Sequence, residues 1–184
     1  MIQIYLMTIP HTSGFFYQYK SKREAYRHAG RALCGYATGY KNILYEKSGK
    51  PYIENENISI SISHTSYEGG GVVAVSFGTG KNGIDVQVKQ AVSKRAKEKL
   101  LGFYSGGEQK FFESWVKYEA RVKCLGMGIV NNGAEVSKIM EEALYYKEIE
   151  GLIDIGVYGA VCSICSEFGE PVWVDHERVF RTFV

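Results

Sequence analysis

Isoleucine and serine alternate without a break between residues 57 and 63, which read NISISIS. Strict alternation places one residue type on each face of a β-strand, so this segment predicts a strand with an isoleucine face and a serine face. Two more strand-like segments follow, GGGVVAVSF at 69–77 and GIDVQV at 83–88. The linkers are short and rich in turn-forming residues, so we expect the three segments to form an antiparallel meander.

Helical patterns lie on either side of these strands. Residues 21–38 have helical periodicity and begin at Ser21, a residue type that caps helix N-termini through its side-chain oxygen. Residues 110–126 predict a longer helix that ends at Gly126, where glycine commonly takes a left-handed conformation. Weaker strand patterns lie at residues 2–7, 144–150, 155–164 and 171–174.

The pattern changes near residue 90, so we predict an α+β fold with an N-terminal half at 1–89 and a C-terminal half at 90–184. The 184 residues suffice for one domain or two small halves, and 45% hydrophobic with 23% charged residues is ordinary globular composition. A net charge of +2 gives no support for nucleic-acid binding. No apolar run reaches the length of a membrane span, so we expect no membrane association.

The four cysteines include one close pair, Cys162 and Cys165, inside an apolar strand pattern. This spacing occurs in zinc and redox sites, but neither a second pair nor a nearby histidine accompanies it. We favour buried free thiols and a reducing cytoplasmic location, with the metal or redox site as the alternative.

Two charged residues lie on the apolar stripe of the long helix. Glu119 and Lys123 follow Trp115 at spacings of four and eight residues, among Phe112 and Val116. An exposed Glu–Lys pair is one explanation, but it predicts polar neighbours. A charge among apolar side chains must be paired or must bind an ion, because desolvation alone costs several kcal/mol.

Asp85 and Gln87 share one face of the strand-like segment 83–88, opposite its valines and isoleucine. This face could simply be exposed to solvent. If it packs against the helix face of Glu119 and Lys123, an oxygen cluster lies beside an ammonium group. That combination suits a hard cation such as Mg²⁺ together with a phosphate ligand.

Several basic residues also suit a phosphate ligand. His64 follows the alternating strand, and Lys50 lies in a tight Gly-Lys-Pro turn. The first helix carries a basic row whose alternative explanation is a solvated face, namely Lys22, Arg23, Arg27 and Arg31.

Seven segments follow one another in a distinctive order. They are SGKPY (48–52), NISISISHT (57–65), VVAVSF (72–77), NGIDVQ (82–87), FYSGGE (103–108), WVKYEARVKCLGMG (115–128) and VYGAVCS (157–163). Gly-Ile-Asp alone is weak, but its joint order with Gly-Lys-Pro, Ser-His-Thr and Trp-x-x-x-Glu-Ala-x-x-Lys is specific. In this order the segments resemble a known family, the 4′-phosphopantetheinyl transferases of the surfactin-synthetase type.

The resemblance implies two similar α/β halves related by a pseudo-twofold axis, with the site between them. It also implies an Mg²⁺-dependent enzyme, with Mn²⁺ as the alternative metal, that acts as a holo-carrier-protein synthase. Such an enzyme moves the phosphopantetheine arm of coenzyme A to a serine of an acyl or peptidyl carrier protein and releases adenosine 3′,5′-bisphosphate. The alternative is a non-catalytic module of the same fold that binds coenzyme A or the carrier. We expect a monomer.

The resemblance also assigns roles to residues. Asp85 and Glu119 match the metal-binding carboxylates, Glu108 a further acid, and Gln87 a position where many members have an acid. Lys123 matches the lysine near the pyrophosphate. Matches to residues that contact the coenzyme A phosphates are Lys50, Ser63, His64 and Arg27, with Arg23 and Lys22 as further partners.

Catalysis is expected to use Glu119 as the base for the carrier serine and Lys123 to stabilise the departing phosphate. Tyr118 departs from the family, which usually has lysine there. The basic run at 93–100 is expected to attract an acidic carrier, or else to be a solvated helix face.

Overall fold

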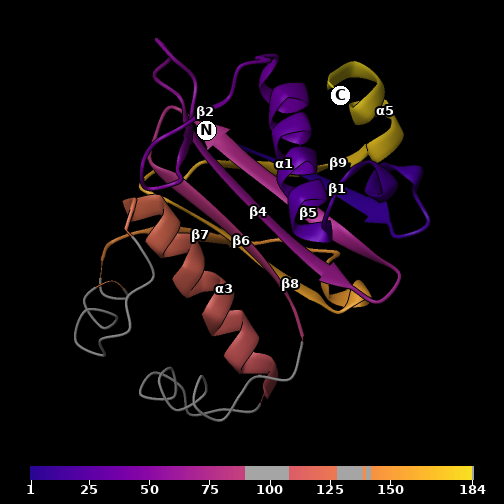
Figure 1. Ribbon diagram of the computed structural model, residues 1–184. Coiled ribbons are helices and arrows are strands. Elements are labelled where there is room, and N and C mark those ends of the chain that lie inside the picture. Colours follow the sequence, from indigo (N-terminus) through magenta and orange to yellow (C-terminus); the bar gives the residue numbers. More distant parts are fainter. Residues whose placement is uncertain (90–107, 128–138, 140–141, 184) are drawn as a thin grey trace.

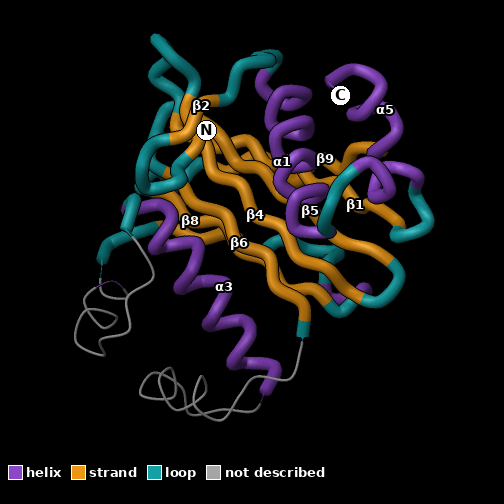
Figure 2. The backbone as a smooth tube through the Cα atoms, viewed as in Figure 1, coloured by secondary structure: helices purple, strands orange, loops and turns teal. Residues whose placement is uncertain are grey.

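The computed structural model describes residues 1–89, 108–127, 139 and 142–183 (Figures 1 and 2). The described part contains three α-helices and three β-sheets, which confirms the predicted α+β arrangement. The helices are α1 (Lys22–Thr38), α3 (Glu108–Leu125) and α5 (His176–Phe183). None of these helices is long and apolar enough to cross a membrane.

The larger sheet has the strand order β4-β5-β1-β9. Its strands are β1 (Ile2–Pro10), β4 (Ser59–Tyr67), β5 (Gly70–Gly78) and β9 (Phe168–Asp175). β5 is antiparallel to both β4 and β1, whereas β9 lies parallel to β1. Helices α1 and α5 lie on one face of this sheet (Figure 1), over an apolar cluster that includes Met7, Ile9, Leu33, Val73 and Val179.

The second sheet has the order β6-β8-β7 and is antiparallel throughout. Its strands are β6 (Asn82–Val88), β7 (Tyr145–Glu148) and β8 (Val157–Ser163), and α3 packs against β6 and β8 (Figure 1). Each of these two sheets thus contains strands from both predicted halves. A second apolar cluster lies between the two sheets and includes Ile4, Leu6, Val72, Ile84, Val86 and Val161.

Short elements complete the described fold. They are the 3₁₀ helices η1 (Gly14–Gln18) and η2 (Ile153–Ile155) and the paired strands β2 (Leu44–Tyr45) and β3 (Pro51–Tyr52).

The predicted meander is wrong at its third strand, because β6 does not pair with β5. Instead, β6 lies beside β4, and hydroxyl groups of β4 take the place of backbone acceptors. Every second residue of β6 directs its backbone N–H away from β8 and towards a β4 side chain. The four bonds are Asn82 to Ser59 (3.4 Å), Ile84 to Ser61 (3.1 Å), Val86 to Ser63 (3.3 Å) and Val88 to Thr65 (3.2 Å). The serine face of β4 therefore joins the two sheets.

The helix ends follow the sequence in two cases. The Ser21 side chain accepts a hydrogen bond from the Glu24 backbone N–H at 3.2 Å, which confirms the predicted N-cap. Gly126 has φ = +70°, as predicted for the residue after α3. Helix α5 was not predicted; Asp175 caps it by accepting a bond from the Glu177 N–H at 2.7 Å.

Candidate functional site

The site is built where α3 lies directly on β6. Gly83 makes this approach possible, because a Cβ atom at this position would collide with the Ala120 carbonyl oxygen and the Cys124 nitrogen. The glycine of Gly-Ile-Asp therefore brings the helix backbone onto the strand. Asp85, two residues further along β6, lies on the same face of the strand and meets α3 there.

Asp85 is 1% exposed, and its two carboxylate oxygens have different surroundings. Oδ1 accepts hydrogen bonds from Lys123 Nζ at 2.7 Å and from Ser63 Oγ at 2.8 Å. Lys123 Nζ also donates to the Ile84 carbonyl oxygen at 3.1 Å. Oδ2 is buried and has no hydrogen-bond partner among the residues that the structure describes. A buried carboxylate oxygen without a donor is costly unless something binds it, so Oδ2 is a candidate ligand atom for a cation.

Glu119 lies one helical turn before Lys123 and is half-buried. Burial raises the pKa of its carboxyl group to about 7; the charge of Asp85 acts in the same direction, and the charge of Lys123 opposes it. A carboxyl group with a pKa near neutrality can accept a proton and release it again at physiological pH. It also gains from a nearby cation, which would favour its charged form.

The oxygen donors available here suit Mg²⁺, which prefers carboxylate and amide oxygens. Gln87 is half-buried and lies on the same face of β6 as Asp85, paired across the sheet with Tyr158. Among the residues that the structure describes, no three His, Cys, Asp or Glu side chains come close enough together to hold a metal. The side chain of Glu108 is not among those that the structure describes. The described part therefore supplies two carboxylates, Asp85 and Glu119.

A pocket of about 300 Å³ lies between the 48–51 turn, β4 and the end of α3, and it is connected to the site through Lys123, which bonds Asp85. Lys50 and Lys123 both line it, together with Ile62 and Met127. Two lysine side chains at one cavity favour an anionic ligand, and the apolar residues would cover its uncharged part. The structure thus places the Gly-Lys-Pro lysine and the α3 lysine at one cavity.

His64 lies on the isoleucine face of β4, within the strand and not at its end as we had expected. Its ring stacks on Tyr26 of α1, with centroids 5.5 Å apart and planes inclined by 16°. Burial lowers the pKa of His64, and the positive charges of Lys123, Arg23 and Arg27 lower it further, whereas Asp85 opposes them. The lowered pKa favours the neutral imidazole. It lies between the charges of α1 and those of α3.

The basic residues of α1 do not all lie near the candidate site. Arg23 and Arg27 are close enough to influence His64 electrostatically, and both are exposed. Arg31, one turn further on, lies over the ring of Tyr45 at 4.8 Å. Of this row, Arg23 and Arg27 are the residues that extend the candidate site.

Sequence reasoning missed Tyr26, whose ring packs against the imidazole of His64. The Tyr26 hydroxyl lies 3.1 Å from His11 Nε2, and Gly71 leaves room for it because a Cβ at residue 71 would overlap the ring. The sequence gives no clear signal for it, because Tyr26 directly precedes Arg27 and neighbouring residues of a helix do not share a face.

Tyr118 and Arg121 lie on other sides of α3. Tyr118 is 4% exposed and packs with Val122 and Ile139, so it belongs to the core. Arg121 is buried and donates to the carbonyl oxygens of Ile139 (3.0 Å) and Glu142 (2.7 Å). Sequence reasoning missed this third inward-facing charge of α3, which bonds the chain on the far side of the helix.

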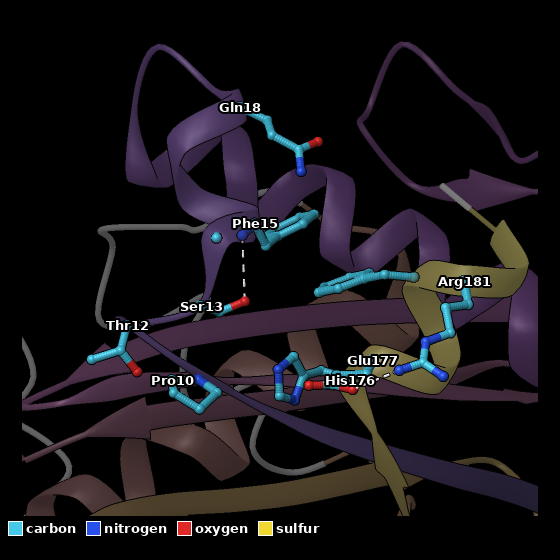
Figure 3. Close-up of a pocket in the computed structure, with 10 residues that line it drawn as sticks. Pro10, Thr12, Ser13, Phe15, Gln18, His176, Glu177 and Arg181 are labelled. Carbon is cyan, nitrogen blue, oxygen red and sulfur yellow. Dashed lines mark hydrogen bonds and ion pairs between the residues drawn. The ribbon is translucent and has the colours of Figure 1, made fainter.

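A wider cavity of about 860 Å³ lies elsewhere, between η1 and α5 (Figure 3). Phe15 stacks there on Phe180 with centroids 4.0 Å apart, and Arg181 pairs with Glu177 at 2.9 Å. None of the predicted site residues lines this cavity. The smaller pocket is lined by two of them, Lys50 and Lys123, and Lys123 bonds Asp85.

No protein-family model and no curated protein matches this chain. The site itself combines a buried carboxylate with one oxygen that no described residue bonds, a second carboxylate with a raised pKa, and two lysines at one cavity.

Proposed function

We propose that this protein transfers the 4′-phosphopantetheine arm of coenzyme A to a serine of an apo carrier protein, in an Mg²⁺-dependent reaction that releases adenosine 3′,5′-bisphosphate. The observation that carries the proposal is the contact between Asp85 and Lys123, with Glu119 one turn away on α3. Opposite charges at one buried point suit a substrate whose phosphates bind a cation and an ammonium group together.

Coenzyme A would bind along the basic residues at the junction of α1, β4 and α3. Lys50 and Lys123 at the 300 Å³ pocket would hold the pyrophosphate. Arg23 and Arg27 are exposed on α1 and are the candidates for the 3′-phosphate. The neutral form of His64 can donate one hydrogen bond to a phosphate oxygen without adding charge.

Asp85 and Glu119 would hold the Mg²⁺ or Mn²⁺ ion, with Gln87 and Glu108 as further candidates. The bound ion would neutralise charge on the pyrophosphate. Glu119 takes the proton of the carrier serine, whose oxygen forms a bond to the β-phosphorus as the bond to the bridging oxygen breaks. Lys123 donates a hydrogen bond or a proton to the departing phosphate. The raised pKa of Glu119 suits proton uptake near neutral pH.

Three features of the architecture support this proposal. Each sheet is covered on its outer face by one long helix, α1 or α3, as two similar halves related by a pseudo-twofold axis would require. The candidate residues come from both sheets of one chain, so a monomer would suffice. The four cysteines are free, which suits the reducing cytoplasm that we propose as the location.

A second candidate is a binding module that holds coenzyme A without transfer. Two observations favour it: the described residues contain only two carboxylates at the site, and Tyr118 is buried in the core, where the related enzymes usually have lysine.

One experiment separates the candidates. The protein is incubated with coenzyme A, Mg²⁺ and an apo acyl or peptidyl carrier protein, and the carrier is weighed by mass spectrometry. A gain of one phosphopantetheine mass supports the transferase, and coenzyme A binding without a gain supports the module. Release of free phosphopantetheine would instead indicate a phosphate-ester hydrolase.

Matched variants assign the chemistry. Glu119→Gln and Asp85→Ala should each abolish transfer. The control Glu177→Gln removes a carboxylate from an exposed ion pair on α5 and should leave transfer unchanged. Near-normal turnover in either site variant would overturn the assignment.

A further inference from the structure

Ser63 makes two hydrogen bonds that tie it to the candidate metal carboxylate. Its hydroxyl lies 2.8 Å from Asp85 Oδ1 and accepts the Val86 backbone N–H at 3.3 Å. Both Ser63 and Asp85 are buried, with exposed fractions of 6% and 1%. We propose that Ser63 is a positioning residue, which holds Asp85 so that Oδ2 remains open for the metal. The inference rests on the proposed function, since it concerns the metal site of that reaction.

Ser63 could either position Asp85 or donate a hydrogen bond to a phosphate. Its hydroxyl has one proton, so it cannot do both at once. An ionised carboxylate can only accept. The Ser63 proton is therefore donated to Asp85 Oδ1. Phosphate oxygens are acceptors as well, so they need a donor that Ser63 does not have available. Lys50 and Lys123, which line the 300 Å³ pocket, supply the donors for phosphate instead.

Asp85 needs a hydrogen-bond donor besides Lys123, because Lys123 also lies at the pocket. Its side chain is 30% exposed and bonds Asp85 Oδ1 from the pocket side. When Lys123 turns to a phosphate, Asp85 loses that donor. Ser63 lies on β4, whose backbone is fixed in the larger sheet, so it keeps Oδ1 in place. Residues that orient metal ligands in this way are commonly worth 10- to 100-fold in metal affinity.

The row of hydroxyls along β4 supplies a matched control. Thr65 accepts the Val88 N–H at 3.2 Å, just as Ser63 accepts the Val86 N–H. Thr65 has no hydrogen bond to a carboxylate among the described contacts, and Thr65→Val keeps its shape. Ser63→Ala and Thr65→Val thus each remove one bond between the sheets, but only Ser63→Ala removes a bond to Asp85.

The test measures two affinities on the full chain. Mn²⁺ binding is followed by electron paramagnetic resonance with coenzyme A at saturation, and coenzyme A binding is measured by calorimetry without metal. We expect Ser63→Ala to weaken Mn²⁺ binding by roughly 10- to 100-fold. Its metal-free affinity for coenzyme A should stay within about twofold of wild type, and Thr65→Val should match wild type in both measurements. Thermal melts of both variants check that they are folded.

Other results would contradict the positioning role, the metal site or the proposed transferase. If Ser63→Ala binds Mn²⁺ like wild type, or loses the metal-free affinity for coenzyme A, the positioning role is wrong. If Thr65→Val weakens Mn²⁺ binding equally, the effect comes from the contact between the sheets, and the role is also wrong. If wild type binds no Mn²⁺, both the role and the metal site fail. If wild type binds Mn²⁺ but does not modify a carrier, the transferase fails and the role stands.

Discussion

Lys123 Nζ lies 2.7 Å from Asp85 Oδ1, and this contact joins the last turn of α3 to the middle of β6. The acid is fully buried and the lysine is partly exposed, so the pair is asymmetric. Removal of the lysine would leave a buried charge, whereas removal of the acid would leave an ammonium group that can reach water.

A double-mutant cycle should reveal this asymmetry. We expect Lys123→Met to destabilise the protein more than Asp85→Asn does, because it leaves the Asp85 charge with Ser63 as its remaining donor. The double variant should recover part of the loss, with a coupling free energy of roughly 1 to 3 kcal/mol. Chemical denaturation measures all four proteins. A coupling near zero would mean that the pair contributes nothing to the fold.

The pKa of Glu119 predicts how stability depends on pH. Burial raises this pKa to about 7 in the folded protein, above its ordinary value of 4.5. The folded state therefore binds more protons than the unfolded state between these values, so the contribution to stability is present below pH 4.5 and is lost as pH rises through 7. Without metal, Glu119→Gln should be more stable than wild type at pH 8 by roughly 1 to 3 kcal/mol.

The same substitution should give a smaller stability difference at pH 5, where Glu119 is largely protonated in the wild type. Thermal melts at both pH values, without divalent cations, make the comparison. A difference that does not change with pH would contradict a raised pKa. Glu119→Gln is also expected to abolish transfer. Glu119 would therefore be required for function although it lowers the stability of the folded protein above neutral pH.

Lys50 should affect binding more than chemistry. It lines the pocket with Lys123 but lies on the 48–51 turn, away from Asp85 and Glu119. We expect Lys50→Met to raise KM for coenzyme A by roughly 5- to 50-fold, with a much smaller change in kcat, because a phosphate contact made throughout the reaction acts on binding. Steady-state kinetics at several coenzyme A concentrations test this. The control Lys41→Met removes an exposed lysine that does not line this pocket.

Helices α1 and α3 and most strands could be predicted from periodicity, because their apolar residues face the core at regular spacing, whereas helix α5 was not predicted. The position of β6 could not be predicted either. A Gly-Ile-Asp segment after a short linker suggests a third strand of a meander, whereas the serines of β4 provide acceptors that allow β6 to leave the sheet. Alternating serine is an ambiguous pattern, since it fits both an exposed face and a row of buried hydroxyls.

The site was partly predictable for a similar reason. Glu119 and Lys123 attracted attention because they interrupt an apolar stripe, and Asp85 because it shares a strand face with Gln87. Tyr26 and Arg121 have no such signal, since a tyrosine and an arginine on amphipathic helices look ordinary. Their roles depend on contacts with His64 and with the carbonyl oxygens of Ile139 and Glu142, which tertiary packing brings near.

Cysteine reactivity provides a simple check of the packing around α3. Cys34, Cys124 and Cys162 are fully buried, and Cys124 packs against Cys162 between α3 and β8. Cys165 is the partly exposed thiol. Native protein treated with iodoacetamide should therefore gain one adduct, at Cys165, and denatured protein should gain four. Rapid native labelling at Cys124 would mean that α3 separates from the sheet.

The close contact of α3 with β6 makes Gly83 the residue on which both fold and site depend. In Gly83→Ala the new methyl group would overlap backbone atoms of Ala120 and Cys124, which cannot turn aside as a side chain can. We expect a loss of about 2 to 4 kcal/mol in stability, because the helix must move away from the strand. The control Gly14→Ala has open space around its Cβ and a backbone conformation that alanine tolerates, so it should be near neutral.

Gly83→Ala should also separate Lys123 from Asp85, since the helix carries the lysine. Transfer should fall by at least about tenfold at a temperature where the variant is still folded, because displacements of about 1 Å in an active site have effects of that size. Circular dichroism establishes the folded range before activity is measured. Full activity in a folded Gly83→Ala protein would mean that the Lys123–Asp85 contact is not needed for the reaction.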